Sequence, residues 1–345
     1  MRASPSFVDD RCSAIPVQFP ALLSWDYTHE DDTLVRLYDK AKRSQWNAAT
    51  DLDWSTAVDP GRVPAERSAM LRHDPASPFG RLTAAELAEL TWESQAWTIS
   101  QFLHGEQGAL LATAKIVDTV PDNDAKLYAA TQVMDEARHV EVYDRYLHEK
   151  VGRTYPINRH LSSLLANLMS DSRWDMTYLG MQIMVESLAL AAFGAIYQTT
   201  DEPLLRDITA HVMGDEARHV AFGIASLRDV YTDMPEAERR DREEFVCEAA
   251  ELMRDRFLQT EVWERMGLPV DACETYMRES PAQQAFRAHL FGKVVPNVKR
   301  IGLLTPYVRD RFNLLGILQY EVAAGVGLTL TTSARCSVRR AGRGR

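Results

Sequence analysis

The sequence lacks the features that mark several common protein classes. Its 345 residues include four cysteines, Cys12, Cys247, Cys273 and Cys336, and none of them forms a Cys-x-x-Cys pair. This scatter argues against a disulfide framework and against a thiolate metal site. Strand signals are nearly absent, because no alternating apolar run is bounded by a hairpin dipeptide such as Asn-Gly or Asp-Gly.

Surplus basic charge and long apolar runs are lacking too. The 49 acidic residues outnumber the 39 basic ones, and the formal net charge of −10 is a poor match for nucleic acid. No uninterrupted apolar run reaches the ~18 residues that a membrane span needs, and the first residues have no signal-peptide core. We therefore expect a cytoplasmic protein with no membrane and no nucleic-acid partner.

The sequence does contain long stretches of helical pattern. Thr83 followed by Glu86 has the spacing of a capping box, and nothing stops the helix that it opens until Pro121. The other expected helices span about 32–46, 122–152, 160–170, 172–199, 203–231, 236–258, 281–294 and 306–325, with Pro269, Pro281, Pro296 and Pro306 as separators. The pattern predicts an all-α protein, a four-helix bundle with additional N- and C-terminal helices.

These helices predict one domain over residues 1–345. The bundle spans about 83–231, with an N-terminal approach segment over 1–82 and accessory helices over 232–330. The last residues, 331–345, hold five arginines and little that can pack. We expect this basic tail to be flexible.

An internal repeat stands out in the sequence. The hexapeptide Asp-Glu-Ala-Arg-His-Val occurs at residues 135–140 and again, unchanged, 80 residues later. Positions i and i+3 of an α-helix lie on the same side. The glutamate and the histidine of each copy, Glu136 with His139 and Glu216 with His219, therefore point in the same direction.

Each copy of the repeat has a partner glutamate thirty residues earlier: Glu106 precedes Glu136, and Glu186 precedes Glu216. In two antiparallel helices joined by a short loop, a residue about fifteen positions before the turn faces one about fifteen after it. The spacing thus brings each pair of glutamates level. Two such hairpins in a bundle would focus four carboxylates and two imidazoles on one point.

The partner glutamates stand among apolar residues. Glu186 lies within Ile183–Leu190, and Glu106 lies between Phe102 and Leu110. A lone ionised glutamate is costly to bury on such a face, and four converging carboxylates repel one another unless cations neutralise them. Two divalent metal ions satisfy this balance. Carboxylate oxygen together with imidazole suits iron or manganese.

A second interpretation applies to each copy of the repeat on its own. A single Asp-Glu-x-Arg-His on a helix is more often a solvated face of ion pairs than a metal site. Two identical copies, each with a partner glutamate at the same distance, favour the metal site because the spacings had to agree independently.

With these residues the chain resembles the ferritin-like carboxylate-bridged di-iron proteins. The branch is that of ribonucleotide reductase small subunits, R2-like oxidases and bacterial di-iron monooxygenase hydroxylases. The resemblance covers about 83–231 and, more weakly, 37–54, which looks like the N-terminal approach segment of such oxidases. It implies two iron ions, with Mn/Fe as a variant, and O2 as co-substrate.

The resemblance also implies two groups of iron ligands, Glu106, Glu136 and His139 in one and Glu186, Glu216 and His219 in the other. Glu136 and Glu216 would bridge the two ions.

Four further residues of the repeat have roles in this resemblance. Asp135 would accept a hydrogen bond from His219, and Asp215 would accept one from His139, which fixes the tautomer of each imidazole. Arg138 and Arg218 would then neutralise the two aspartates.

Departures from the family patterns bear on the reaction. Tyr143, four residues after His139, holds the position of the radical tyrosine in reductase small subunits, where a redox role competes with that of a core tyrosine beside a polar site. Those subunits commonly have aspartate at the position of Glu106, and this chain has no late tyrosine in its tail.

Two other branches carry residues that this chain lacks. Met181 stands where ligand-binding oxidases have a tyrosine five residues before the third glutamate, so their ether cross-link is not expected. Val212 stands where arylamine N-oxygenases have an extra histidine. His211 is one step away, about 100° off the required face, and we interpret it as a structural or supporting residue.

The residues and the resemblance together predict an O2-activating non-haem di-iron oxygenase or oxidase. It would hydroxylate, N-oxygenate or desaturate a small organic substrate, for example in tailoring a specialised metabolite. The first alternative is a radical-generating subunit for a partner enzyme. A ferritin-like protein that stores iron or reacts with peroxide is the less favoured second alternative. No flavin or nicotinamide motif is visible, which implies a separate ferredoxin or flavin reductase as electron donor. A homodimer also stays open.

Overall fold

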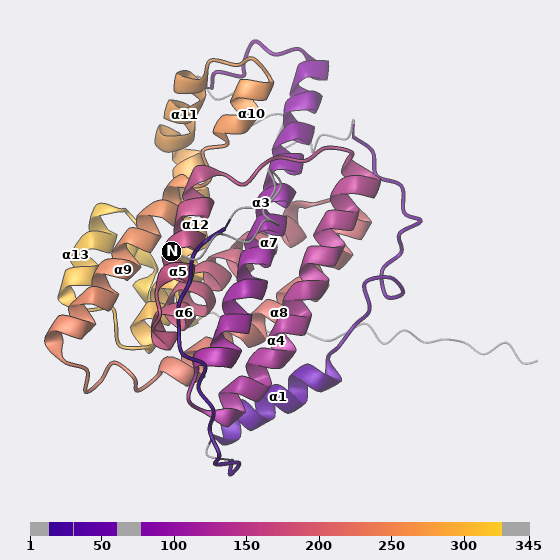
Figure 1. Cartoon of the computed structure of the whole chain (residues 1–345). Coiled ribbons are helices and arrows are strands. Elements are labelled where there is room, and N and C mark those ends of the chain that lie inside the picture. Colours follow the sequence, from indigo (N-terminus) through magenta and orange to yellow (C-terminus); the bar gives the residue numbers. More distant parts are fainter. Residues whose placement is uncertain (1–13, 30, 61–76, 326–345) are drawn as a thin grey trace, which may run out of the picture.

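A computed structural model describes residues 14–29, 31–60 and 77–325. Every regular element in this part of the chain is a helix (Figure 1). The prediction of an all-α protein is confirmed. The basic tail, Cys12, Cys336 and most of the expected loop between Pro60 and Pro78 lie outside the described residues.

The first hairpin of the bundle consists of α3 (Ala84–Thr119) and α4 (Asn123–Tyr146). The predicted capping box is present: the backbone N–H of Thr83 donates to Glu86 Oε2 at 2.8 Å, and that of Glu86 donates to Thr83 Oγ1 at 3.2 Å. Asp122 caps α4 by accepting from two backbone N–H groups of its first turn. The α4 helix then continues through a π-helical turn, η1 (Leu147–Val151), to Gly152.

The second hairpin consists of a composite helix and α8 (Pro203–Leu227). The composite helix runs through α6 (Trp174–Tyr178), the π-helix η2 (Leu179–Val185) and α7 (Glu186–Thr199). It is long and apolar enough to span a membrane by composition, but 72% of its most apolar window is buried inside the protein. It is therefore the central helix of the core.

The two hairpins match residue for residue around their loops. Each partner glutamate, Glu106 or Glu186, lies 13 residues before the end of its helix. Each repeat glutamate, Glu136 or Glu216, lies 13 residues after the start of the next helix. At about 1.5 Å of rise per residue, all four glutamates lie about 20 Å from the loops of their hairpins.

Additional helices surround the bundle on several sides. The N-terminal α1 (Asp32–Arg43) packs across α4 and α8 at one end of the bundle (Figure 1). The helix α5 (Arg159–Ser170) contacts α3 and α9 (Glu236–Asp255), and α9 also packs on η2. The helix α12 (Pro281–Arg300) packs on α7. These contacts bury the apolar composite helix on the side away from α3 and α4.

Two expectations about the C-terminal region are wrong, and two short helices there were missed. Pro296 does not separate two helices but lies inside α12, where packing against α7 compensates for the lost backbone hydrogen bond. The short helices α10 (Thr260–Arg265) and α11 (Val270–Glu279) were not expected. The helix expected over 306–325 divides into α13 (Pro306–Leu314) and the 3-10 helix η3 (Leu318–Gly325), because Gly316 adopts φ 72°.

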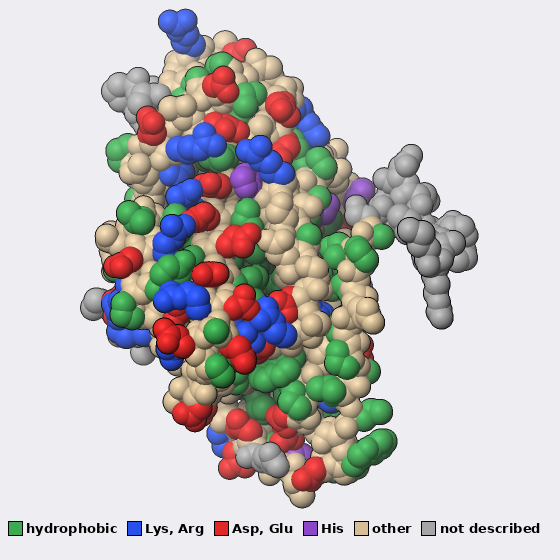
Figure 2. Space-filling model, turned by 60° about the vertical axis from the view of Figure 1, so that its left-hand side comes forward, with side chains coloured by type: hydrophobic (Ala, Val, Ile, Leu, Met, Phe, Trp, Pro, Cys, Tyr) green, Lys and Arg blue, Asp and Glu red, His purple; other side chains and the backbone are tan. Residues whose placement is uncertain are grey.

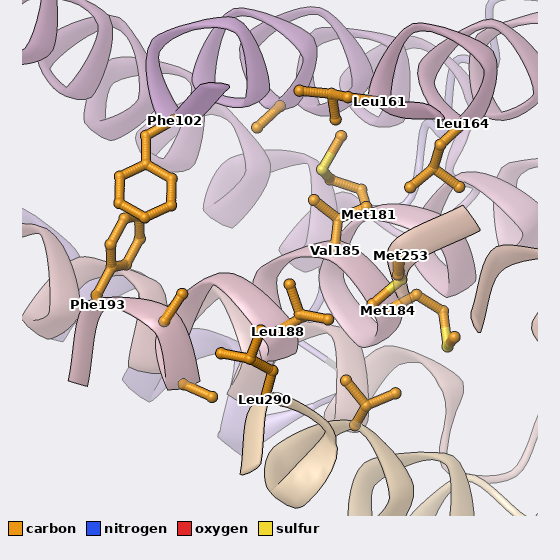
Figure 3. Packing of buried hydrophobic residues seen from close by; sticks show 14 of the residues in the cluster. Phe102, Leu161, Leu164, Met181, Met184, Val185, Leu188, Phe193, Met253 and Leu290 are labelled. Carbon is orange, nitrogen blue, oxygen red and sulfur yellow. The ribbon is translucent and has the colours of Figure 1, made fainter. Parts of the chain in front are cut away.

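The core lies between the bundle and the accessory helices. Figure 3 shows Met181, Met184, Val185 and Leu188 of the composite helix surrounded by apolar side chains from the neighbouring helices. On the face shown in Figure 2, acidic and basic side chains are interspersed. Cys247 and Cys273, the two cysteines of the described part of the chain, are buried and free.

A glycine on α8 allows the close approach of η2. A Cβ atom at Gly223 would lie 2.5 Å from Gln182 Cβ, whereas a Cβ atom at Gly214 on the same helix would meet nothing within 4 Å. We expect Gly223→Ala to lower the free energy of unfolding by about 1–3 kcal/mol, because η2 and α8 must move apart. The control Gly214→Ala should be neutral or stabilising by up to ~1 kcal/mol. Urea unfolding of both variants checks this, and equal effects would contradict it.

Candidate metal centre

Six side chains from four helices meet in the middle of the bundle. They are Glu106 from α3, Glu136 and His139 from α4, Glu186 from α7, and Glu216 and His219 from α8. None of the six is more than 5% exposed. The structure thus brings together all of the residues that the sequence indicates as metal ligands.

These side chains form two groups of closely spaced oxygen and nitrogen atoms. Potential ligand atoms lie within 4.8 Å of one another in each group, the first made up of Glu106, Glu136, His139 and Glu216 and the second of Glu136, Glu186 and His219. The centroids of the two imidazole rings are 6.0 Å apart. Each group offers the carboxylate and imidazole ligands that one iron or manganese ion prefers.

Glu136 and Glu216 each lie close to the histidines of both groups. The Oε2 atom of Glu136 is 3.4 Å from His139 Nδ1, and its Oε1 atom is 3.1 Å from His219 Nδ1. Glu216 is placed in the same way: its Oε1 atom is 3.3 Å from His139 Nδ1, and its Oε2 atom is 3.6 Å from His219 Nδ1. Each of these carboxylates therefore has one oxygen directed to each group, which is the placement that a bridging ligand needs.

Buried polar atoms without partners test whether metal ions fit. Within the described part of the chain, one carboxylate oxygen each of Glu136, Glu186 and Glu216 makes no hydrogen bond, and neither does His219 Nδ1. Unpartnered buried polar atoms are costly and rare in proteins. All four belong to the two groups of potential ligands. Metal ions bound there would satisfy them.

Two aspartates contact the Nε2 atoms of the two imidazoles. His139 Nε2 lies 3.1 Å from Asp215 Oδ2, and His219 Nε2 lies 3.3 Å from Asp135 Oδ2. Each aspartate therefore contacts the histidine of the other half, in the pairs that the resemblance implies. When Nε2 donates to the aspartate, the Nδ1 lone pair points to the carboxylate groups and is free for a metal.

Two arginines tie the aspartates together across the halves. Arg138 contacts Asp135 at 2.5 Å and Asp215 at 3.2 Å. Arg218 contacts Asp215 and also Asp135, the latter at 3.2 Å. The two guanidinium charges balance the two carboxylates in a buried network of charge-assisted hydrogen bonds.

The end of the approach segment completes this network. Gln45 Nε2 donates to Asp135 Oδ1 at 2.9 Å, and Gln45 Oε1 accepts from Arg138 at 2.6 Å. Trp46 Nε1 donates to Asp215 Oδ2 at 2.8 Å. The sequence singled out the segment 37–54 but not these two residues, because only the fold shows that α1 ends over α4 and α8.

A small cavity opens beside the six side chains. Three of them, Glu106, Glu186 and Glu216, line it, and most of the remaining lining is apolar. Its walls include Phe102 and Phe193, which face one another in Figure 3 with ring centroids 4.7 Å apart. The cavity has a volume of about 30 Å³, which is room for about one water molecule.

A sequence model of the p-aminobenzoate N-oxygenase AurF family matches residues 27–302. The chain belongs to this family. Membership makes it an O2-activating di-iron oxidoreductase, as the sequence predicts, and the buried cluster of glutamate and histidine fits a two-metal cofactor. No curated protein sequence matches the chain.

Solved structures of R2-like ligand-binding oxidases share the fold. A variant with an anaerobically reconstituted Mn/Fe cofactor is 20% identical, with a TM-score of 0.56 over 79% of this chain and 95% of that chain. Another such variant is 21% identical, with a TM-score of 0.55 over 79% and 95%. A form with an aerobically reconstituted metal cofactor after photoconversion is 19% identical, with a TM-score of 0.52 over 79% and 94%. These similarities confirm the ferritin-like fold.

Val212 stands where the resemblance to arylamine N-oxygenases implies an extra histidine. The side chain at this position is fully buried and apolar, so it supplies no additional imidazole. Its neighbour His211 contacts the backbone carbonyl of Asp207 at 2.9 Å and packs on Trp46 with ring centroids 4.8 Å apart. His211 is thus a structural residue outside the cluster.

The equivalent position in the first half holds a glutamine that the sequence did not single out. Gln132, one helical turn before Glu136, donates through Nε2 to Glu186 Oε1 at 2.7 Å and to Glu136 Oε1 at 3.1 Å. Its Oε1 has no partner among the described residues. The i, i+4 spacing from Glu136 is the signal that could have identified it.

Tyr143 lies in the wall of the cluster, one turn beyond His139. It is fully buried, and its ring lies near those of Phe102 and Phe193, with centroids 5.9 and 6.1 Å away. Its hydroxyl has no hydrogen-bond partner in the described part of the chain. Burial and the charge of Glu106 raise the pKa of Tyr143 well above its ordinary value. The hydroxyl therefore keeps its proton.

Burial sets the protonation of the metal-free cluster. It raises the pKa of Glu106 to about 8 and that of Glu186 well above its ordinary value. Burial alone would lower the pKa of His139 and His219, but the surrounding carboxylates outweigh it and raise both pKa values well above the ordinary range. Without metal, these groups retain protons at neutral pH.

Metal uptake should therefore release protons. Metal ions bind the deprotonated forms of glutamate and histidine, so they must displace the protons that these raised pKa values retain. We expect the affinity for Fe(II) to increase as the pH rises from about 6 to above 8, by at least ten-fold overall. Anaerobic titrations with Fe(II) at several pH values, with a pH indicator to count protons, measure this. An affinity independent of pH would contradict it.

Proposed function

We propose that this protein reduces O2 at a di-iron centre held by the six clustered side chains and transfers oxygen to a small organic substrate. The ligands in this proposal are Glu106, Glu136 and His139 for one ion and Glu186, Glu216 and His219 for the other, with Mn/Fe as an alternative metal content. The observation that carries the proposal is the convergence of four buried carboxylates and two imidazoles beside an apolar cavity. Amine N-oxygenation is the reaction that membership of the N-oxygenase family favours.

The bound metals would supply the electrons that reduce O2 and the oxidising power that acts on the substrate. The chain's own residues position and shield this chemistry. Asp135 and Asp215 accept hydrogen bonds from the Nε2 atoms and so keep each imidazole in the tautomer whose unprotonated Nδ1 faces the centre. The apolar walls around Phe102 and Phe193 exclude water from the face that the cavity opens on.

Two partners follow from this chemistry. A small-molecule substrate is consistent with the family and with the apolar cavity. Oxygen transfer to a substrate consumes external electrons, and the sequence carries no flavin or nicotinamide motif. We therefore include a separate ferredoxin or flavin reductase in the proposal.

Removing the bridging carboxylates tests the centre. We expect Glu136→Ala combined with Glu216→Ala to reduce bound iron from two per chain to none, because both groups of ligands lose their shared oxygens. Uptake of O2 by the reduced, iron-loaded protein should fall at least a hundred-fold. The matched control is Glu141→Ala, an exposed glutamate on the same helix, which should leave both readings unchanged. Two irons retained in the double variant would show that the ligands lie elsewhere.

Labelled oxygen tests the reaction. With an aromatic amine, reduced iron-loaded protein and ¹⁸O2, mass spectrometry should detect ¹⁸O on the substrate nitrogen. If O2 is consumed and the label appears only in water, the protein is an oxidase and the oxygen transfer in our proposal is wrong.

Whether Tyr143 forms a radical distinguishes this function from that of a radical-generating subunit. The radical function needs a tyrosine that loses its proton on oxidation, but the Tyr143 hydroxyl has no described acceptor and a raised pKa. We expect electron paramagnetic resonance after addition of O2 to show no tyrosyl radical. Tyr143→Phe should keep two irons per chain and change O2 uptake less than three-fold. A tyrosyl signal that Tyr143→Phe abolishes would favour the radical-generating subunit.

A further inference from the structure

One arginine lies at the cavity without any described ion-pair partner. Arg256, at the C-terminal end of α9, lines the cavity together with Glu106, Glu186 and Glu216. Only 6% of the residue is exposed, and its Nε has no hydrogen-bond partner in the described part of the chain. Its guanidinium packs over the ring of Phe257, 5.4 Å from the centroid.

This arrangement differs from that of the other buried arginines at the centre. Arg138 and Arg218 each contact two aspartates. No carboxylate of the described residues lies within 4.0 Å of Arg256, and burial lowers its pKa to about 10. A buried, unpaired guanidinium is costly, because it has lost its water without gaining an anion. Such a group is a candidate for binding a ligand.

The backbone around Arg256 is also unusual. Arg256 and Phe257 belong to the short connection between α9 and α10, which ends at Gln259. Gln259 has φ 56°, and among the described residues it is the non-glycine residue with positive φ. A left-handed conformation costs free energy for a residue with a side chain, and residues held in such conformations cluster at active sites and ligand clamps. The connection that carries Arg256 to the cavity thus ends at a residue in a costly conformation.

The charge balance at the centre indicates the charge of the ligand that Arg256 would bind. In the proposed centre, two divalent ions neutralise four glutamates, and the two aspartates neutralise Arg138 and Arg218. Glu106 acts on the charge of Arg256 only when it is ionised. In the metal-free protein burial keeps Glu106 protonated at neutral pH, and in the loaded protein a bound metal would take up its charge. With the metals in place, Arg256 remains as one uncompensated positive charge at the cavity. A ligand with one negative charge would compensate it.

The apolar walls of the cavity indicate the chemistry of the rest of the ligand. Phe102, Leu188, Ala192 and Phe193 line the cavity beside Arg256. These side chains offer contact to a hydrocarbon or aromatic body and no hydrogen bonds. Because the cavity is only about 30 Å³ as it stands, side chains must move when an organic molecule enters. Phe257 and Phe102 are slightly exposed, at 9% and 7%, whereas Phe193 is almost completely buried.

We propose that Arg256 binds the carboxylate of the substrate and orients its apolar body toward the metal centre. This assignment rests on the proposed function, since it places the substrate in the cavity that borders the metal ligands. A guanidinium pairs with a carboxylate through two parallel hydrogen bonds, which fixes the orientation of the molecule as well as its affinity. Arg256 is thus a specificity-determining residue for organic acids.

Binding of benzoate and benzamide tests the assignment. The two molecules have nearly the same shape, but only benzoate carries a charge. Calorimetric titration of the anaerobic, Fe(II)-loaded protein should show benzoate binding at least ten-fold more tightly than benzamide. Arg256→Met should remove this preference, and Arg256→Lys should retain part of it. The control Arg254→Met removes an arginine of the same helix that pairs with Asp255 and does not line the cavity, and it should leave benzoate binding unchanged.

Several results would overturn the assignment. Equal affinities for benzoate and benzamide in the unmodified protein would exclude recognition of the charge, whatever the variants do. Benzoate binding unaffected by Arg256→Met would mean that the carboxylate binds elsewhere, for example at the metals. Acetate binding as tightly as benzoate would show a simple anion site without an apolar subsite. Loss of iron from Arg256→Met would show that Arg256 maintains the centre instead. Failure of the proposed function is a separate result, the absence of O2 uptake in the unmodified protein.

Discussion

Mutual repulsion of four buried carboxylates is the constraint on which this structure depends. Glu106, Glu136, Glu186 and Glu216 converge in an apolar interior, and such a cluster is stable only if protons or cations neutralise it. In the metal-free state burial, together with the neighbouring glutamates, raises the pKa of Glu106 and Glu186, so that protons neutralise these two carboxyl groups. Metal ions can take the same place and add chemistry. The buried acid is therefore the functional part of a chain whose net charge is −10.

The fold serves this convergence through two matched hairpins. Equal distances from the loops put the four glutamates level, and the shared aspartates and arginines lock the hairpins to each other across the centre. The approach segment adds Gln45 and Trp46 to that lock. On the opposite side, Phe102 and Phe193 leave a small apolar cavity at Glu106 and Glu186. One side of the centre is thus bounded by charge-assisted hydrogen bonds, and the other by the apolar side chains of the cavity.

The sequence predicts the parts of the site that local rules determine. Helix periodicity and the thirty-residue interval place Glu106 opposite Glu136, because the geometry of a short helical hairpin needs no further information. Gln132 and Arg256 were missed for different reasons. Gln132 lies one helical turn before Glu136 on the same face, but glutamine is common in helices, so the i, i+4 spacing alone did not single it out. Arg256 reaches the cavity only through the packing of α9, and no local pattern encodes such a contact. Pro296 was misread because tertiary packing overrides a local helix breaker.

The measurement that tests the central claim most directly is anomalous X-ray diffraction from crystals of the iron-loaded protein. The account predicts two iron peaks about 3.5–4 Å apart, one bounded by Glu106 and His139 and the other by Glu186 and His219, with Glu136 and Glu216 between them. A single peak, or peaks away from these six side chains, would contradict it.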